Sequence, residues 1–281
     1  MQKIILQGPK LKKETVSEIA VELNGMFEIR RNYFKMTVKK PVSGKQLATL
    51  RSTADFDVNV LPEGFSPGKI RLLITDMDST FINIECVDEI ADFMNIKARV
   101  AAITASAMRG EINFETSLTR RIGLLEGLSS DALEHVYNER LGLNPGGETM
   151  LAGLKSRGIK IALVSGGFTF FTDRLKQRYQ LDYTLANNLD ISDNKLTGKV
   201  QGRIVGAEAK ADFLIQLCKQ LGINTQQVVA MGDGANDLKM MKLAGLSIAY
   251  HAKPAVRTEA NAVLNYSGLE GVLGLLDIDK F

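Results

Sequence analysis

Two acidic side chains, one residue apart, follow an apolar run near residue 72. The run is Leu72 to Ile74, and the acidic residues are Asp76 and Asp78. In open α/β sheets, ligands bind beyond the carboxyl ends of the strands, so these carboxylates stand where a site is expected. Carboxylates can serve there as a nucleophile or as a general acid. An isolated pair of this kind is more often an acidic turn that caps the next helix.

A second acidic group follows the apolar run Val228 to Met231. It lies in the segment Gly232 to Asp237, which reads GDGAND. Glycines permit tight turns close to a ligand, and the carboxylates of Asp233 and Asp237 are hard oxygen ligands suited to Mg²⁺. The alternative is a glycine loop in which Asp237 caps the following helix.

A hydroxyl and two glycines follow a third apolar run. Ser165, Gly166 and Gly167 come directly after Ile161 to Val164. Backbone N–H groups and the serine hydroxyl can together bind phosphate oxygens, although a simple strand-to-helix turn explains these residues equally well. Lys210 is the fourth candidate, near the start of an amphipathic helical pattern where a lysine is ordinarily only solvated.

Apolar runs separated by helical patterns predict the framework that must position these groups. The runs are Leu72 to Ile74, Ile159 to Val164, Val228 to Met231, Leu246 to Tyr250 and Ala262 to Leu264. Near-continuous apolar strands alternating with helices indicate an α/β fold with a parallel sheet covered on both faces. Three of the four candidate groups then stand at the ends of separate strands.

The interval from Ile84 to Leu143 breaks this rhythm and predicts a helical insertion after the first strand. Helical signals span Val87 to Phe93, Lys97 to Met108, Phe114 to Leu125 and Asp131 to Arg140. A second interruption, Asp190 to Ile204, predicts a hairpin that turns at Ser192, Asp193 and Asn194.

Residues 1–60 predict a separate small α+β unit. Their pattern is β-α-β-α-β in outline, which becomes β-α-β-β-α-β if Phe27 to Val38 supplies two strands. The segment 61–69, LPEGFSPGK, has two prolines and two glycines and is the predicted linker. Residues 70–281 then form the larger domain.

The composition of the chain argues against several classes of function. The 281 residues carry a formal net charge of +3, too little clustered charge for a dedicated nucleic-acid binder. No uncharged stretch approaches the roughly 20 apolar residues of a membrane span, and the first residues lack the apolar core of a signal peptide. Cys86 and Cys218 are expected to be free thiols in the cytoplasm.

The order of the four candidate groups resembles the haloacid dehalogenase-like phosphatase superfamily. D-x-D-S-T, Ser-Gly-Gly, a single Lys and G-D-G-x-N-D match its motifs over about residues 70–281. The resemblance implies a doubly wound parallel sheet, a Rossmann-like core, with a helical cap inserted at about residues 84–143.

The resemblance also implies roles for the motif residues. Asp76 would be the nucleophile that forms an aspartyl-phosphate, and Asp78 the general acid and base. Mg²⁺ would be held by Asp76, the backbone carbonyl of Asp78 and Asp233. The phosphoryl oxygens would be bound, directly or through a supporting residue, by Ser165, Gly166, Gly167, Lys210, Asn236 and Asp237.

Three segments are similar to the phosphoserine phosphatase family in particular: Asp76 to Ala91, Phe114 to Gly127 and Gly232 to Pro254. The similarity implies that Glu85 binds a substrate ammonium and that Arg121 binds a carboxylate, which arginine can grip with two parallel hydrogen bonds. Met108 and Phe114 would be apolar cap residues that exclude water. The alternatives are helix packing for Met108 and Phe114, a solvated helix face for Arg121, and a helix-start position for Glu85.

The resemblance therefore implies Mg²⁺-dependent hydrolysis of O-phospho-L-serine to L-serine and phosphate, the final step of serine biosynthesis. The expected partner is this small molecule, with no nucleic acid and no membrane. One alternative is a related phosphatase or phosphotransferase for another small phosphomonoester, and another is a non-catalytic amino-acid sensor. Residues 1–60 resemble ferredoxin-like or ACT-like regulatory domains, and the other interpretation is a module for homodimer formation or for packing against the cap.

Overall fold

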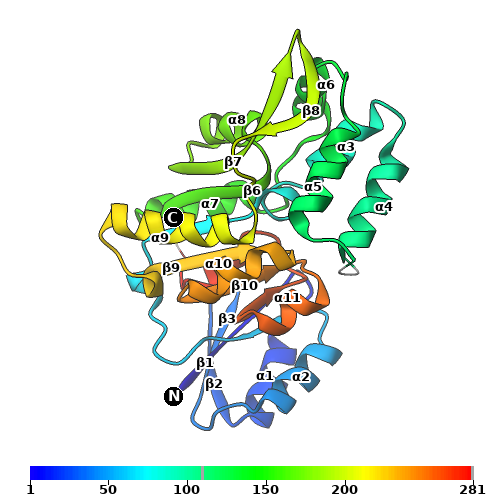
Figure 1. The fold of residues 1–281 in the computed structure, drawn as a ribbon. Helices are drawn as coiled ribbons and strands as arrows, with labels where there is room; N and C mark the ends of the chain where they lie inside the picture. The colour runs from blue at the N-terminus through cyan, green and yellow to red at the C-terminus, as the bar shows by residue number, and fades with distance from the viewer. Residues whose placement is uncertain (109–110, 280–281) are drawn as a thin grey trace.

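The computed structural model describes residues 1–108 and 111–279, and these residues build two β-sheets (Figure 1). The larger sheet has the strand order β11-β10-β9-β5-β6-β7-β8. Its strands are β5 (Leu72–Thr75), β6 (Lys160–Phe168), β7 (Tyr183–Ser192), β8 (Lys195–Gln201), β9 (Val228–Gly232), β10 (Leu246–Tyr250) and β11 (Ala262–Leu264). Every pair of neighbours is parallel except β7 and β8, which are antiparallel.

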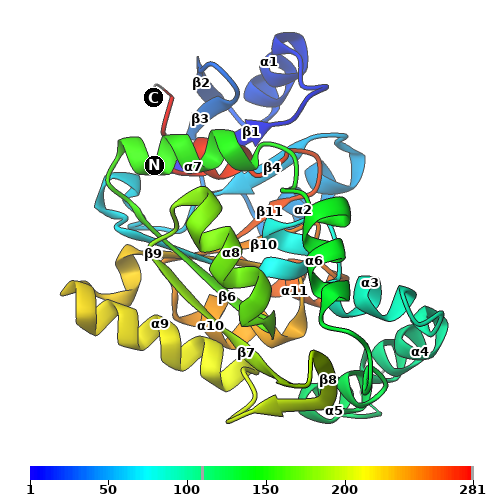
Figure 2. The same ribbon diagram turned by 90° about the horizontal axis from the view of Figure 1, so that it is seen from above.

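Helices cover both faces of this sheet, as the apolar runs predicted. They are α7 (Gly147–Ser156), α8 (Thr169–Tyr179), α9 (Ala207–Leu221), α10 (Leu238–Leu243), α11 (Pro254–Glu259) and α12 (Gly271–Leu275). One core cluster joins α7, α8 and α12 to the sheet, and another joins α9, α10 and α11 to the opposite face (Figure 2). The central strands β5, β9 and β10 are buried throughout, which explains their uninterrupted apolar sequences.

Two details of the large sheet differ from the predictions. The five strands predicted from apolar runs are all parallel to their neighbours, and the sheet is extended by β7 and by β8, which pairs antiparallel because a hairpin joins it to β7. That hairpin was predicted, and it turns at Asp193 and Asn194, both at positive φ as its tight turn requires. In addition, β6 continues to Phe168, so that Ser165 lies within the strand rather than after it.

The helical insertion lies between β5 and β6. Its helices are α3 (Cys86–Asp92), α4 (Lys97–Met108), α5 (Phe114–Gly123) and α6 (Asp131–His135), followed by a π-helical turn at Val136–Arg140. Each helix coincides with a predicted helical signal to within a few residues. In Figure 1 the helices α3, α4 and α5 stand to one side of the large sheet, beyond the ends of its strands.

The first sixty residues form a four-stranded antiparallel sheet with the order β2-β3-β1-β4. Its elements are β1 (Gln2–Gln7), α1 (Lys13–Glu22), β2 (Gly25–Ile29), β3 (Phe34–Val38), α2 (Gly44–Thr53) and β4 (Asp57–Val60). The five-element outline was therefore incomplete, because β2 and β3 are separate strands. The result is the β-α-β-β-α-β order of ferredoxin-like folds.

Buried hydrogen bonds join this small sheet to the edge of the large one. The Asn59 side chain donates to the carbonyl of Val263 and accepts from its N–H, over 2.9 and 2.8 Å, so it pairs with β11 as a neighbouring strand would. The Asp57 carboxylate accepts from the backbone N–H groups of Asn265 (2.7 Å) and Ser267 (2.9 Å). Both side chains are buried, and together they satisfy backbone groups that an open sheet edge would expose.

Within residues 1–108 and 111–279, no helix combines the length and the apolarity that crossing a bilayer requires.

Candidate active site

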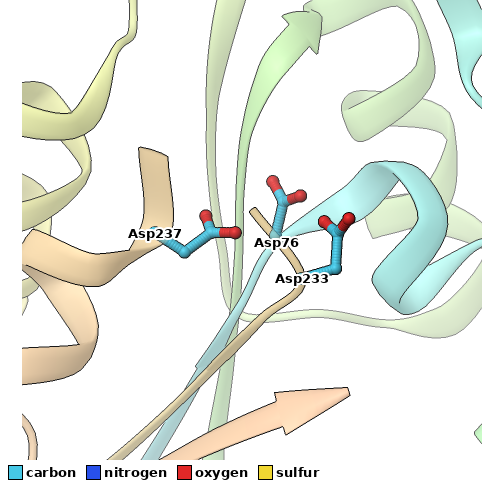
Figure 3. A group of neighbouring side chains, drawn as sticks. All are labelled: Asp76, Asp233 and Asp237. Carbon is cyan, nitrogen blue, oxygen red and sulfur yellow. The ribbon is translucent and has the colours of Figure 1, made fainter. Parts of the chain in front are cut away.

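Three carboxylates meet where β5 and β9 end. These neighbouring parallel strands carry Asp76 and Asp233 at their carboxyl ends, and the turn before α10 carries Asp237. One oxygen of each carboxylate lies within 4.8 Å of the others, and Asp76 stands between Asp233 and Asp237 (Figure 3). Because parallel neighbours end at the same edge of the sheet, residues 157 positions apart in sequence come into contact distance.

Lys210 is fully buried among these carboxylates. From the first turn of α9, its Nζ donates to Asp76 Oδ1 at 2.5 Å and to Asp237 Oδ1 at 2.7 Å. Burial alone would lower the pKa of the ammonium, but the two carboxylates outweigh it and raise the pKa. The interpretation of Lys210 as a solvated lysine is therefore wrong.

Asp237 is held by that lysine and by its own turn. Its Oδ2 accepts from the N–H of Gly234 at 3.1 Å, and its side chain makes no capping hydrogen bond to α10. Capping of the following helix is therefore not its role. Asn236, beside it, is half-buried with its Oδ1 packed against Gly234.

The electrostatics of the cluster fit a hard cation. Burial, followed by the negative charge of Asp237, raises the pKa of Asp76, and the same two causes raise the pKa of Asp233 to about 6. Three carboxylates beside the ammonium of Lys210 leave an excess of negative charge in a desolvated place. Oxygen donors in this arrangement are those that divalent hard cations prefer, so this group of residues could hold a metal ion.

Asp78 lies next to the cluster with a different environment. Its Oδ1 accepts from the N–H of Cys86 at 3.2 Å, at the start of α3. Burial raises the pKa of Asp78 to about 7, with a further contribution from the negative charge of Glu85. A carboxyl group with this pKa can both give and take a proton near neutrality, which is the property of a general acid and base.

Ser165, Gly166 and Gly167 face the same place from β6. A Cβ at Gly167 would lie 3.0 Å from both Asp78 Oδ2 and Ser165 Oγ, so only glycine leaves these oxygens their space. The N–H of Gly167 donates to Ser165 Oγ at 2.8 Å. Asn187 on β7 donates to the carbonyl of Gly166 at 2.8 Å and accepts from a backbone N–H of the segment before α9.

The cap contributes Phe114 and Arg121, both from α5. A Cβ at Gly166 would lie 2.5 Å from Cζ of Phe114, so the cap touches the core directly over the strand end. Arg121, about two helical turns further on, is buried on the same side, and its Nε has no hydrogen-bond partner among the described residues. The solvated-face interpretation is wrong for Arg121 and holds for its neighbour Arg120, which is exposed.

Glu85 and Met108 complete the predicted set. Glu85 is exposed at the N-terminus of α3, where its carboxylate accepts from Ser79 Oγ at 2.6 Å instead of capping the helix. Met108 ends α4, and its side chain lies outside the residues that the structure describes.

Some residues of this region were not singled out from the sequence. Thr80 is buried with Oγ1 3.5 Å from Asp233 Oδ1, and Lys253 Nζ lies 3.8 Å from Asp233 Oδ2. Asp88 is coupled electrostatically to Arg121, and Asn187 supports the strand end at Gly166. Single polar residues without a spacing pattern offered no signal that distinguishes them from ordinary polar positions.

Comparisons with known proteins agree on the family. A haloacid dehalogenase-like hydrolase family model matches residues 70–245. A phosphoserine phosphatase of Polaromonas sp. is 50% identical over 78% of this chain and 95% of its own. A HAD family hydrolase structure from Salmonella enterica serovar Typhi has a TM-score of 0.89 at 35% identity and covers 99% of both chains.

A probable phosphoserine phosphatase structure from Vibrio cholerae, in unliganded form, has a TM-score of 0.83 at 35% identity. It covers 99% of this chain and 87% of its own, so the similarity includes the four-stranded N-terminal sheet. The chain therefore belongs to the haloacid dehalogenase-like hydrolases and, within them, to the phosphoserine phosphatase family.

Proposed function

We propose that this chain is a Mg²⁺-dependent phosphatase that converts O-phospho-L-serine and water to L-serine and phosphate. The observation that carries the proposal is the buried Arg121, whose Nε has no hydrogen-bond partner among the described residues and which lies about two helical turns from Phe114, the residue packed over Gly166. A buried donor without a partner costs about 1–3 kcal/mol, so a substrate carboxylate that satisfies it gains affinity. The similarity to phosphoserine phosphatases supports the same substrate.

In the proposed mechanism, Asp76 attacks the phosphorus atom and the bond from phosphorus to the serine oxygen breaks. Asp78, protonated at the start, gives its proton to that oxygen, and L-serine leaves. Asp78, now a carboxylate, takes a proton from water as the water attacks the aspartyl-phosphate, and this releases phosphate and restores both residues. The pKa of about 7 suits Asp78 to both steps.

Neutralisation of the phosphoryl charge is the main task of the surrounding groups. Lys210, Ser165 and the N–H groups at Gly166 and Gly167 would bind the oxygens that the metal leaves free, with Asn236 alongside. Asp76, Asp233 and the backbone carbonyl of Asp78 would hold Mg²⁺, which supplies positive charge to the transferring group. Asp237 would keep Lys210 charged and in place.

The amino-acid part of the substrate would meet one charge of each sign. Glu85 would bind its ammonium, and Arg121 its carboxylate. Phe114, packed over Gly166, would exclude water from the reacting atoms, and we assign the same task to Met108.

We further propose that the enzyme acts in the cytoplasm, where it catalyses the final step of serine biosynthesis. Residues 1–60 would form an accessory domain, residues 61–69 a linker, and residues from about 84 to 143 the cap. Formation of a homodimer is part of the same proposal.

The direct test is phosphate release from O-phospho-L-serine with Mg²⁺ and with EDTA. We expect rapid release of phosphate that EDTA abolishes and that restored Mg²⁺ recovers. Without the cation, the carboxylates repel the negatively charged phosphoryl group. Release that EDTA leaves unchanged would contradict the metal site. Release of phosphate from p-nitrophenyl phosphate but not from phosphoserine would contradict the proposed substrate. Formation of a phosphorylated alcohol in place of free phosphate would indicate phosphotransfer.

Arg121→Ala is expected to lower kcat/KM for phosphoserine by about 100-fold, because a charge-assisted pair of hydrogen bonds is lost. Hydrolysis of p-nitrophenyl phosphate, which has no carboxylate, should change little. Steady-state kinetics on both substrates measure the difference, and Arg120→Ala is the matched control on the exposed side of the same helix. Equal losses on the two substrates would rule out carboxylate binding by Arg121.

A further inference from the structure

Ser79 has a backbone conformation that serine rarely adopts. It lies directly after Asp78 with φ +55° and ψ 0°, in the left-handed region. This region favours glycine, and among other residues it favours asparagine and aspartate. A serine held there implies that its side chain contributes something that glycine would not.

The side chain of Ser79 makes one short hydrogen bond, and it is to a substrate-binding candidate. Its Oγ donates to Glu85 Oε1 at 2.6 Å, while its N–H donates to the carbonyl of Ile84 at 3.1 Å. Backbone and side chain of one residue thus hold two consecutive residues at the start of the cap. The left-handed turn brings the hydroxyl to Glu85 across a separation of six residues.

Glu85 needs such support because its carboxylate makes no other hydrogen bond or ion pair within residues 1–108 and 111–279. The residue is exposed, and its side chain does not cap α3. An exposed glutamate samples several rotamers, and ordering it costs free energy when a ligand binds. A hydrogen bond to Oε1 restricts this motion and leaves Oε2 free to accept from an ammonium.

We propose that Ser79 is a positioning residue for substrate selection, which holds the Glu85 carboxylate in the orientation that receives the substrate ammonium. The proposal rests on the proposed function of the site. Ser79 acts through Glu85 and does not itself touch the reacting atoms. Because Ser79 follows Asp78 directly, the same turn sets the distance between the ammonium site and the acid that protonates the leaving oxygen.

The test compares phosphoserine with its desamino analogue, 3-(phosphonooxy)propanoate, in Ser79→Ala and Ser79→Gly. We expect both variants to raise KM for phosphoserine by about tenfold, the effect of one hydrogen bond to a charged group, with kcat little changed. The desamino analogue should be hydrolysed as by the wild type. Ser79→Gly accommodates the left-handed conformation without strain, so it separates loss of the hydroxyl from loss of the fold.

A double-mutant cycle with Glu85→Ala gives a readout that a merely structural role would not move. If Ser79 acts through Glu85, Ser79→Ala has no further effect on phosphoserine when Glu85 is already absent. Ser129→Ala is the matched control, since Ser129 Oγ also donates to an exposed carboxylate, that of Asp131, at 2.9 Å. It should leave both substrates unaffected.

Two results would overturn the inference. One is an equal loss on phosphoserine and the desamino analogue, and the other is a full additional loss from Ser79→Ala in the Glu85→Ala background. A wild-type enzyme that does not distinguish the two substrates would instead overturn ammonium binding by Glu85, and with it this part of the proposed function. A selective wild type with unaffected Ser79 variants would overturn only the role of Ser79.

Discussion

We expect Asp76→Asn to lower the rate of phosphate release by about 10⁴-fold or more, because an amide could not form the proposed covalent intermediate and the residues of such a mechanism act as a unit. The substitution changes one oxygen to nitrogen at a buried position, so the fold should persist. Single-turnover assays with phosphoserine, together with acid-quench detection of phosphoprotein, measure the effect. Persistent turnover, or a phosphoprotein in the variant, would exclude Asp76 as the nucleophile.

The stability of the same variant provides the control for folding. Burial and the charge of Asp237 raise the pKa of Asp76 above its usual value of 3.8, so the folded state keeps this proton to higher pH than the unfolded chain does. The contribution of Asp76 to stability is therefore complete below the unfolded pKa and is lost as pH rises through the folded pKa. In EDTA, the difference in the free energy of unfolding between Asp76→Asn and the wild type should therefore change in favour of the variant as pH rises. A difference that does not depend on pH would contradict this account.

Lys210→Met is expected to remove both activity and stability. The ammonium is fully buried between Asp76 and Asp237, and its loss leaves two carboxylates facing one another without a countercharge. Breaking a buried ion pair by removing one partner costs about 3–5 kcal/mol. Urea unfolding in EDTA measures the free energy of unfolding, and phosphate release measures the loss of phosphoryl binding. An unchanged free energy of unfolding would mean that one of the two carboxylates takes up a proton when the lysine is absent.

Two further variants identify the cause of that loss. Lys239→Met removes an ammonium from the exposed ion pair with Glu208 and should cost less than about 1 kcal/mol, as exposed pairs do. Adding Asp237→Asn to Lys210→Met removes one of the two facing carboxylates and should recover part of the stability without recovering activity. Recovery of activity as well would show that Lys210 is needed only to compensate Asp237.

Local patterns predicted much of the scaffold. The strands β10 and β11 and the helix α4 have the bounds that their apolar spacing indicated, because burial on one or both faces imposes a period that sequence displays directly. The turn at Asp193 and Asn194 was also predictable, since both residue types tolerate positive φ. The sequence does not decide whether β2 and β3 are separate strands, because a polar turn between two short strands resembles one irregular extended stretch.

The sequence likewise predicted some features of the site and not others. The residue types at Asp76, Asp78, Asp233 and Lys210, in their order along the chain, were sufficient for the sequence to indicate phosphoryl transfer and the family. The burial of Lys210 was not predictable, because the spacing of a helix does not tell which neighbours will cover it. Arg121 was distinguished from Arg120 by the resemblance to the phosphoserine phosphatase family, whereas nothing local distinguished Ser79 from any serine in a turn.

The sequence by itself thus determined which chemistry the chain carries and on which elements, since both depend on residue type and on short-range spacing. The tertiary structure alone decided which charged groups lose their contact with water: Lys210 lies between two carboxylates, Arg121 is buried with an Nε that has no hydrogen-bond partner among the described residues, and Asp78 has a pKa of about 7. It also decided that Asn59 pairs with the edge strand β11, 204 residues away. Desolvation and long-range pairing depend on atoms brought together from distant parts of the chain, and no local pattern encodes them.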